Sequence, residues 1–250
     1  MISLEDIQSA AATLHGRILH TPLIHSATFT KMVGAQVFLK LENLQKTGSF
    51  KLRGATFKLL RNAAAIGSRG VVAASAGNHA QGVALAARLA GIAAAIVMPL
   101  GSSISKQEAT RGYGGDVILD GNNLEESLRK AQAMAQEGKV LVHPYDDEDI
   151  ITGQGTIGLE ILEEIPDPDV IFVPIGGGGL IAGIASAVKA VRPQTLIIGV
   201  QAAACPSAYA SIQAGRVVRV EARKSIADGT LCHLQLRAGA QAHTPTLKPP

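Results

Sequence analysis

The chain has 250 residues, of which 47% are hydrophobic and 17% are charged, and its formal net charge is +3. This composition excludes disordered and collagen-like chains, and the mild charge makes nucleic acid an unfavoured partner. A chain of this length buries enough surface to fold without a metal or a disulfide.

Short apolar runs alternate with helical patterns along the chain, which is typical of βαβ units in a parallel sheet. Residues 1–15 carry two early acids and apolar residues at helical spacing, so they predict a surface helix rather than a secretory signal. The predicted strands span residues 36–42, 70–76, 93–99, 116–120, 139–143, 170–175, 195–200 and 217–221. The predicted helices span about residues 52–63, 79–90, 124–136, 154–164 and 180–191.

One uncharged stretch, residues 170–188, is long enough to cross a bilayer. Pro174 and four consecutive glycines interrupt it, so it predicts a strand, a loop and a helix instead. The acidic residues 146–149 precede a predicted helix and are interpreted as the crossing between two α/β lobes.

Three segments carry residues suited to chemistry, and the first is SFKLRGA at 49–55. Lys51 follows a glycine-containing loop and stands at the predicted start of a helix. It is either an ordinary surface lysine or a lysine that attacks an aldehyde. The second role requires burial or a neighbouring cation, here Arg53, to favour the neutral amine.

The second segment is SAGNHAQG at 75–82, which follows a strand and opens a helix. Its backbone N–H groups and the positive end of the helix suit a carboxylate. The alternative is a helix cap by Ser75 or Asn78, with His79 solvated in the first turn.

The third segment is GGGGL at 176–180, between an apolar strand and a helix. Its N–H groups can converge on phosphate oxygens, whereas a close-packing turn without a ligand is the alternative. Gly177, Gly179 and Ala182 also satisfy a dinucleotide-binding pattern. The next strand ends at Gln201, however, where a ribose site usually has an acid.

Together the three segments resemble the serine/threonine dehydratase family of fold-type II pyridoxal-phosphate enzymes, and most closely its threonine dehydratases. The resemblance runs from about Ile7 to Gly229. Its motifs are HTPL at 20–23, LKLENLQKTGSFKLRGA at 39–55, SAGNHAQG, HPYDD at 143–147, GQGT at 153–156, GGGGL and SIADG at 225–229.

The fold that the resemblance implies is α/β, with two lobes of parallel or mostly parallel sheet flanked by helices, like the β chain of tryptophan synthase. The larger lobe, which binds the phosphate, comprises residues 1–45 and 146–229 and is incomplete. The smaller lobe comprises residues 46–145.

The resemblance also implies a role for each matching residue. Lys51 binds pyridoxal 5'-phosphate covalently, Phe50 packs against its pyridine ring and Asn78 hydrogen-bonds the ring hydroxyl. Ser75, Asn78 and His79, with the loop N–H groups, bind the substrate carboxylate. The cofactor phosphate is held by Gly176, Gly177, Gly178, Gly179 and Leu180. No metal is expected.

The implied reaction is a β-elimination that converts L-threonine to 2-oxobutanoate and ammonia, and L-serine to pyruvate. Serine racemase is a relative with the same fold, but it has a serine as proton donor where this chain has Ala76. Elimination is therefore favoured over racemisation. The expected protein acts on a small amino acid, forms a homo-oligomer, and binds neither nucleic acid nor a membrane. Cys205 and Cys232 form no CxxC pair, which points to the cytoplasm.

The match ends after Gly229, as if the chain were truncated or frame-shifted. Residues 230–250 contain no acid and three prolines, and they predict an irregular tail. Cys232 is a candidate to face the pyridine nitrogen, although its flanks do not match the family. Two hypotheses of different class follow: an active threonine dehydratase, or a non-catalytic remnant that binds pyridoxal phosphate. An NAD-binding oxidoreductase is a weaker third hypothesis.

Overall fold

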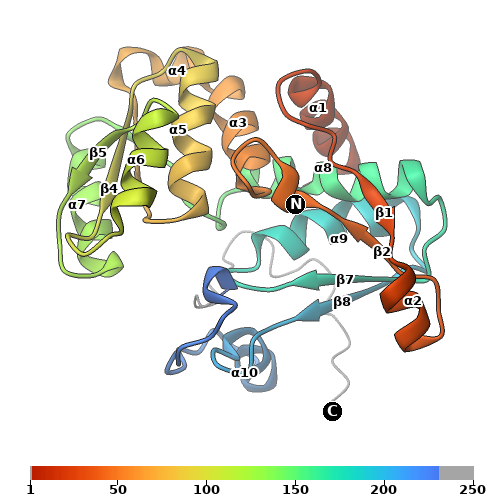
Figure 1. Cartoon of the computed structure of the whole chain (residues 1–250). Helices are drawn as coiled ribbons and strands as arrows, with labels where there is room; N and C mark the ends of the chain where they lie inside the picture. Colours follow the sequence, from red (N-terminus) through yellow and green to blue (C-terminus); the bar gives the residue numbers. More distant parts are fainter. Residues whose placement is uncertain (1, 231–250) are drawn as a thin grey trace.

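The computed structural model describes residues 2–230, which form α/β units around two parallel sheets (Figure 1). The helices are α1 (Leu4–Leu14), α2 (Ala27–Val33), α3 (Lys51–Arg61), α4 (Ala63–Ile66), α5 (Asn78–Ala90), α6 (Ile104–Gly112), α7 (Leu124–Gln136), α8 (Glu148–Glu164), α9 (Gly179–Val191) and α10 (Ser207–Ala214). The strands are β1 (Leu23–His25), β2 (Phe38–Lys40), β3 (Val71–Ala74), β4 (Ala94–Met98), β5 (Asp116–Leu119), β6 (Val140–Leu141), β7 (Val170–Pro174) and β8 (Leu196–Val200). Short 3₁₀ turns are η1 (Glu42–Leu44), η2 (Gly67–Arg69) and η3 (Asp228–Thr230).

The first parallel sheet has four strands in the order β5-β4-β3-β6. Its central strands are short, apolar and buried on both faces, as expected where helices cover a parallel sheet. Val71 and Ala73 of β3 pack in the cluster that contains α5, whereas Val72 and Ala74 pack in the cluster that contains α7. This alternation places α5 and α7 on opposite faces.

The second parallel sheet pairs β7 with β8, and β1 pairs antiparallel with β2 in a separate ladder. Val173 of β7 and Ile197 of β8 are buried on the face that packs against α8 and α9. Phe172 and Val200 lie on the opposite face and are 67% and 50% exposed. Figure 1 shows this sheet below α8 and α9, apart from the four-stranded sheet at the left.

The α/β class with parallel sheets is confirmed, and a strand forms within each predicted range except 217–221. The prediction for residues 217–221 is wrong. They pair with no strand in the described part of the chain, and Val217 is 50% exposed. Their alternation of apolar and charged residues suits a strand, but a strand also needs a neighbouring edge to pair with.

The helix that follows the acidic residues 146–149 starts earlier than predicted. The helix predicted from residue 154 begins at Glu148, because the Asp147 carboxylate accepts a hydrogen bond from the Ile150 N–H and caps it. Glu148 and Asp149 then occupy the first turn, where negative charge is favoured by the helix dipole. Most of this acidic run therefore starts α8, and its place at the crossing between two lobes stays a prediction.

Residues 170–188 form β7, the glycine loop and most of α9, as predicted. Within residues 2–230, no helix combines the length and apolar character needed to cross a membrane. The boundaries of the two lobes stay a prediction. Apart from Thr230, the predicted tail at 230–250, with Cys232, lies outside the described residues.

Candidate active site

The three helices that carry the singled-out segments share one local feature. Within the described residues, α3, α5 and α9 begin with no side-chain cap, as do α4, α6 and α10, whereas Ser3, Asn123 and Asp147 cap other helices. The first N–H groups of a helix have no acceptor within the helix and carry a partial positive charge. Helices α5 and α9 begin just after the carboxyl ends of β3 and β7, so both edges present groups that suit an anion.

Lys51 is the first residue of α3 and is half-buried. Its Nζ donates a 2.7 Å hydrogen bond to the carbonyl oxygen of Pro144. The same Nζ lies 5.3 Å from the ring centroid of Phe50 and 5.8 Å from that of Tyr145. A Cβ atom built on Gly82 would lie 3.1 Å from the carbonyl carbon of Lys51, so α5 packs directly against this turn.

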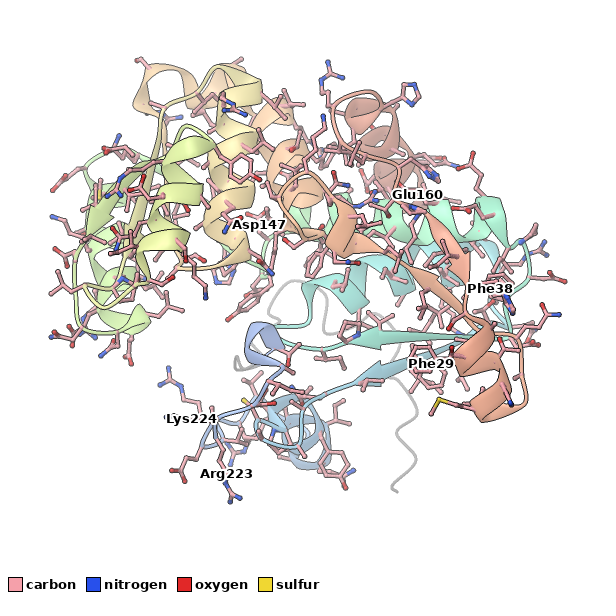
Figure 2. The ribbon with its side chains drawn as sticks, viewed as in Figure 1. Phe29, Phe38, Asp147, Glu160, Arg223 and Lys224 are labelled. Carbon is pink, nitrogen blue, oxygen red and sulfur yellow. The ribbon has the colours of Figure 1, made fainter. Side chains whose placement is uncertain are left out.

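Arg53 is fully buried one half-turn from Lys51 and pairs with two carboxylates. Its guanidinium donates to Glu42 at 2.7 Å and to Glu160 at 2.5 Å, and Glu160 also pairs with Lys40 at 2.7 Å. The charge of Arg53 is thus balanced by Glu42 and Glu160, and its predicted effect on the Lys51 amine stays a prediction. Figure 2 shows Glu160 on α8, well beyond Asp147 at the start of that helix.

The pKa values of this cluster follow from two opposing effects. Burial alone would lower the pKa of Arg53, but its bonds to Glu42 and Glu160 outweigh burial and raise it. Burial would raise the pKa of Glu160, but the bonds and charges of Arg53 and Lys40 lower it overall. The cluster stays ionised and fixes α3 against α8.

In the second segment, Ser75, Asn78 and His79 have different environments. The Ser75 hydroxyl accepts from the Gly77 N–H at 3.2 Å and does not cap α5, while Asn78 is exposed. His79 is only 4% exposed, and its Nε2 lies 3.0 Å from the Val142 carbonyl oxygen. The solvated-histidine alternative is therefore wrong. Because Nε2 is already bonded to Val142, His79 would contact a carboxylate through its backbone N–H.

Burial, and to a lesser extent the positive charge of Lys51, lower the pKa of His79 to about 3. The ring is therefore neutral at ordinary pH, and Nε2 carries the proton that it donates to Val142. Helix α5, which carries His79, also packs against Lys51 at Gly82, and this contact connects the second segment to the first.

Sequence reasoning missed the segment after β6 as a functional element. The His143 Nδ1 accepts hydrogen bonds from the N–H of Tyr145 at 3.3 Å and of Asp146 at 2.8 Å. The His143 and Tyr145 rings meet edge to face with centroids 4.8 Å apart. The motif HPYDD at 143–147 was the available signal, but it carried no assigned role.

The glycine loop packs against this same segment. A Cβ atom on Gly177 would overlap the ring of Tyr145, and one on Gly179 would lie 2.6 Å from the Tyr145 carbonyl oxygen. Gly178 occupies the position before α9 with φ of 99°, a left-handed conformation that favours glycine. Leu180 and Phe50 are both partly buried against the cluster of β7 and α9.

The predicted residues thus come from the start of α3 and from the loops that follow β3 and β7. The Lys51 amine lies near the rings of Phe50 and Tyr145, Tyr145 lies against the glycine loop, and α5 packs against Lys51 at Gly82. A nucleophilic amine, aromatic rings and two uncapped helix starts suit a ligand that has an aldehyde, a flat ring and a phosphate. Within residues 2–230, no group of three His, Cys, Asp or Glu side chains is placed to hold a metal.

Relatives of known name match most of this chain. The model of the family described as pyridoxal-phosphate dependent enzyme matches residues 14–242. An L-threonine ammonia-lyase of Thermotoga maritima is 50% identical over 230 residues, which are 92% of this chain and 57% of that protein. A catabolic L-threonine dehydratase of Escherichia coli strain K12 is 44% identical over 229 residues, covering 91% of this chain and 70% of that protein.

Solved structures agree with these matches. The processed form of threonine deaminase isoform 2 from Solanum lycopersicum has a TM-score of 0.88 at 37% identity, covering 94% of this chain and 64% of that chain. Maize serine racemase has a TM-score of 0.90 at 38% identity, covering 93% of this chain and 71% of that chain. The predicted fold class is confirmed. The chain spans only 57% of the Thermotoga protein's length.

Proposed function

Because the chain belongs to the family of pyridoxal-phosphate dependent enzymes, we propose that it eliminates water from L-threonine to give 2-oxobutanoate and ammonia. L-Serine is the second proposed substrate and gives pyruvate. The observation that carries the proposal is the position of the Lys51 amine, held at 2.7 Å from Pro144 between the rings of Phe50 and Tyr145. The names of the similar proteins from Thermotoga maritima and Escherichia coli support the choice of substrate.

The cofactor is pyridoxal 5'-phosphate, and the chain offers one group for each of its parts. We assign its aldehyde carbon to Lys51, its ring to Phe50 and its ring hydroxyl to Asn78. We assign its phosphate to Gly176–Gly179 and Leu180, whose N–H groups stand at the uncapped start of α9. No metal is required by these assignments.

The chain's own residues then account for the elimination. When bound, the cofactor supplies an electron-withdrawing ring that takes up the negative charge left at Cα. The N–H groups at the start of α5, with Ser75 and Asn78, hold the substrate carboxylate. The Lys51 amine, freed when the substrate amine takes its place, accepts the Cα proton and passes a proton to the β-hydroxyl, which leaves as water. A second water hydrolyses the C–N bond of the product, so L-threonine yields 2-oxobutanoate and ammonia.

Racemisation is not proposed, although maize serine racemase has a similar structure. A racemase needs a second proton donor near Cα, and the position before Gly-Asn-His is Ala76. The Ala76 methyl group packs against the apolar cluster of β3 and α5 and has no proton to donate.

The deciding experiment measures 2-oxobutanoate formed from L-threonine by the 250-residue chain with added pyridoxal phosphate. We expect turnover by the wild type and by Lys106→Ala, an exposed lysine on α6, and none by Lys51→Ala. Comparable turnover by Lys51→Ala would overturn the assignment of Lys51. A folded wild type that binds the cofactor through Lys51 but forms no product would instead support the non-catalytic alternative.

The remaining proposals concern assembly and location. We infer a homo-oligomer by resemblance to the family, and a cytoplasmic location because the chain has only two cysteines and they form no CxxC motif. Gel filtration with light scattering measures the first, and fractionation of cells that express the chain measures the second.

A further inference from the structure

Tyr145 lies between the glycine loop and the residues that surround the Lys51 amine. Its N–H donates to His143 Nδ1, and its ring stands edge to face with the His143 ring at 4.8 Å. The ring also lies against Gly177, and the Tyr145 carbonyl oxygen lies against Gly179. The preceding residue, Pro144, accepts the hydrogen bond from Lys51 Nζ.

These contacts give Gly177 a second reason to be glycine. A phosphate-binding loop uses glycines so that N–H groups can approach oxygen atoms. At Gly177, however, the atom that a Cβ would strike belongs to the ring of Tyr145. The missing side chain therefore makes room for an aromatic ring of this chain, whatever else it admits.

We propose that Tyr145 is a positioning residue, whose ring sets how far the Lys51 amine stands from the glycine loop. Within the segment 143–145, Pro144 holds the amine and Tyr145 packs against Gly177 and Gly179. A shift of the ring therefore moves one end of the site relative to the other. The inference deepens the proposed function, because it rests on Lys51 and the glycine loop holding the two ends of the cofactor.

The first test is a double-mutant cycle on pyridoxal phosphate affinity, measured by spectroscopic titration and by borohydride trapping on Lys51. We expect Gly177→Ala to weaken affinity at least about tenfold, since the methyl group displaces the ring. Tyr145→Ala also weakens it, but adding Gly177→Ala to Tyr145→Ala changes affinity by no more than about twofold. An equal loss from Gly177→Ala in both backgrounds would show that the glycine serves the phosphate directly, and would overturn the proposal.

The second test needs no cofactor. Reductive methylation with formaldehyde and borohydride reports the reactivity of the Lys51 amine, and mass spectrometry compares it with Lys106 in the same chain. We expect Tyr145→Ala and Gly177→Ala to change the Lys51-to-Lys106 ratio at least about threefold, because the amine loses its fixed surroundings. Tyr145→Phe keeps the ring and should leave the ratio and the affinity within about twofold of wild type.

The controls separate positioning from general loss of structure. Tyr209→Ala removes a tyrosine that is 43% exposed on α10, and Gly101→Ala adds a methyl group with nothing among the described residues within 4 Å. Neither should change the ratio. A Tyr145→Ala variant that melts earlier but keeps the wild-type ratio would reduce Tyr145 to a structural residue. A wild type that fails to trap the cofactor on Lys51 refutes the proposed function, and the ratio still decides the role of Tyr145.

Discussion

His79 and Arg53 are both buried close to Lys51, yet their environments stabilise opposite charge states. Arg53 stays charged because Glu42 and Glu160 each bond to its guanidinium. Removing one carboxylate would leave a buried charge without its balance, which typically costs about 3–5 kcal/mol. His79 has no such partner among the described carboxylates and donates to a backbone carbonyl as a neutral ring.

The neutral state of His79 predicts a pH dependence of stability. In the unfolded chain a histidine has its ordinary pKa of 6.5, whereas burial lowers the pKa of folded His79 to about 3. Between these values the unfolded state binds the extra proton, so the free energy of unfolding falls as the pH falls below 6.5. The slope reaches about 1.4 kcal/mol per pH unit. Burial lowers the pKa of His143 too, so this residue also makes the free energy of unfolding fall as the pH falls.

Urea unfolding at pH 7.5, 6.5 and 5.5 measures this slope. We expect His79→Gln to flatten it, because an amide keeps a donor for Val142 but does not titrate. His15→Gln, at an exposed position after α1, is the matched control and should leave the slope as in wild type. An unchanged slope in His79→Gln would contradict the assignment.

At the scale of elements, glycines set how closely the helices behind the site approach one another. A Cβ on Gly54 of α3 would lie 2.5 Å from the Ile150 carbonyl oxygen on α8, and one on Gly153 would lie 2.6 Å from the Cα of Gly54. Gly155 and Gly183 make the same kind of approach between α8 and α9. The backbone of α3, which carries Lys51, is therefore seated directly on α8.

This packing predicts that two glycine-to-alanine substitutions change the stability of the protein in opposite directions. Alanine normally stabilises a helix relative to glycine by up to about 1 kcal/mol. We expect Gly112→Ala on α6 to follow that rule, because nothing among the described residues lies within 4 Å of the added methyl group. Gly54→Ala should destabilise the chain by about 1–3 kcal/mol through overpacking. Thermal and urea unfolding of the two variants checks this, and stabilisation by Gly54→Ala would rule out the close approach.

The elements that could be predicted from sequence are those whose pattern is local. Strands β3 and β4 are short apolar runs, and α5 and α7 have helical spacing, so each was recognisable by itself. Helix α6 is polar along most of its length, and β1 is only three residues long, so neither gives a clear period.

The same distinction applies to the site. Lys51 and the four glycines were found because each stands in a recognisable local segment. The part played by Tyr145 depends on Gly177 and Gly179, which are more than 30 residues away in sequence. The pairing of Arg53 with Glu160 spans 107 residues and is likewise invisible to local pattern.

At the scale of the whole molecule, the outer face of the β7–β8 sheet is apolar and exposed. Phe172 is 67% exposed, Val200 is 50% exposed and Leu196 is 44% exposed, whereas the inner face is covered by α8 and α9. Figure 2 also shows Phe29 and Phe38, which are 46% and 38% exposed, on α2 and β2. An apolar sheet face in water favours self-association.

We therefore expect Phe172→Lys to raise the protein concentration at which light scattering begins by about twofold or more. The thermal midpoint should change little, since this side chain gains little from burial in the folded state. Ile104→Lys, at a side chain 76% exposed on α6, is the control that lies off the sheet. An equal rise in this concentration for both substitutions would show that the β7–β8 face is not the cause of self-association.

The contact between Tyr145 and Gly177 also has an evolutionary consequence. Two positions that occupy the same space cannot drift independently, because a methyl group at 177 is accommodated only after the ring at 145 has become smaller. Descendants of this chain should therefore change the two positions together, or change 145 first. The contact between the loop and the ring therefore restricts the order in which substitutions at positions 145 and 177 can be accepted.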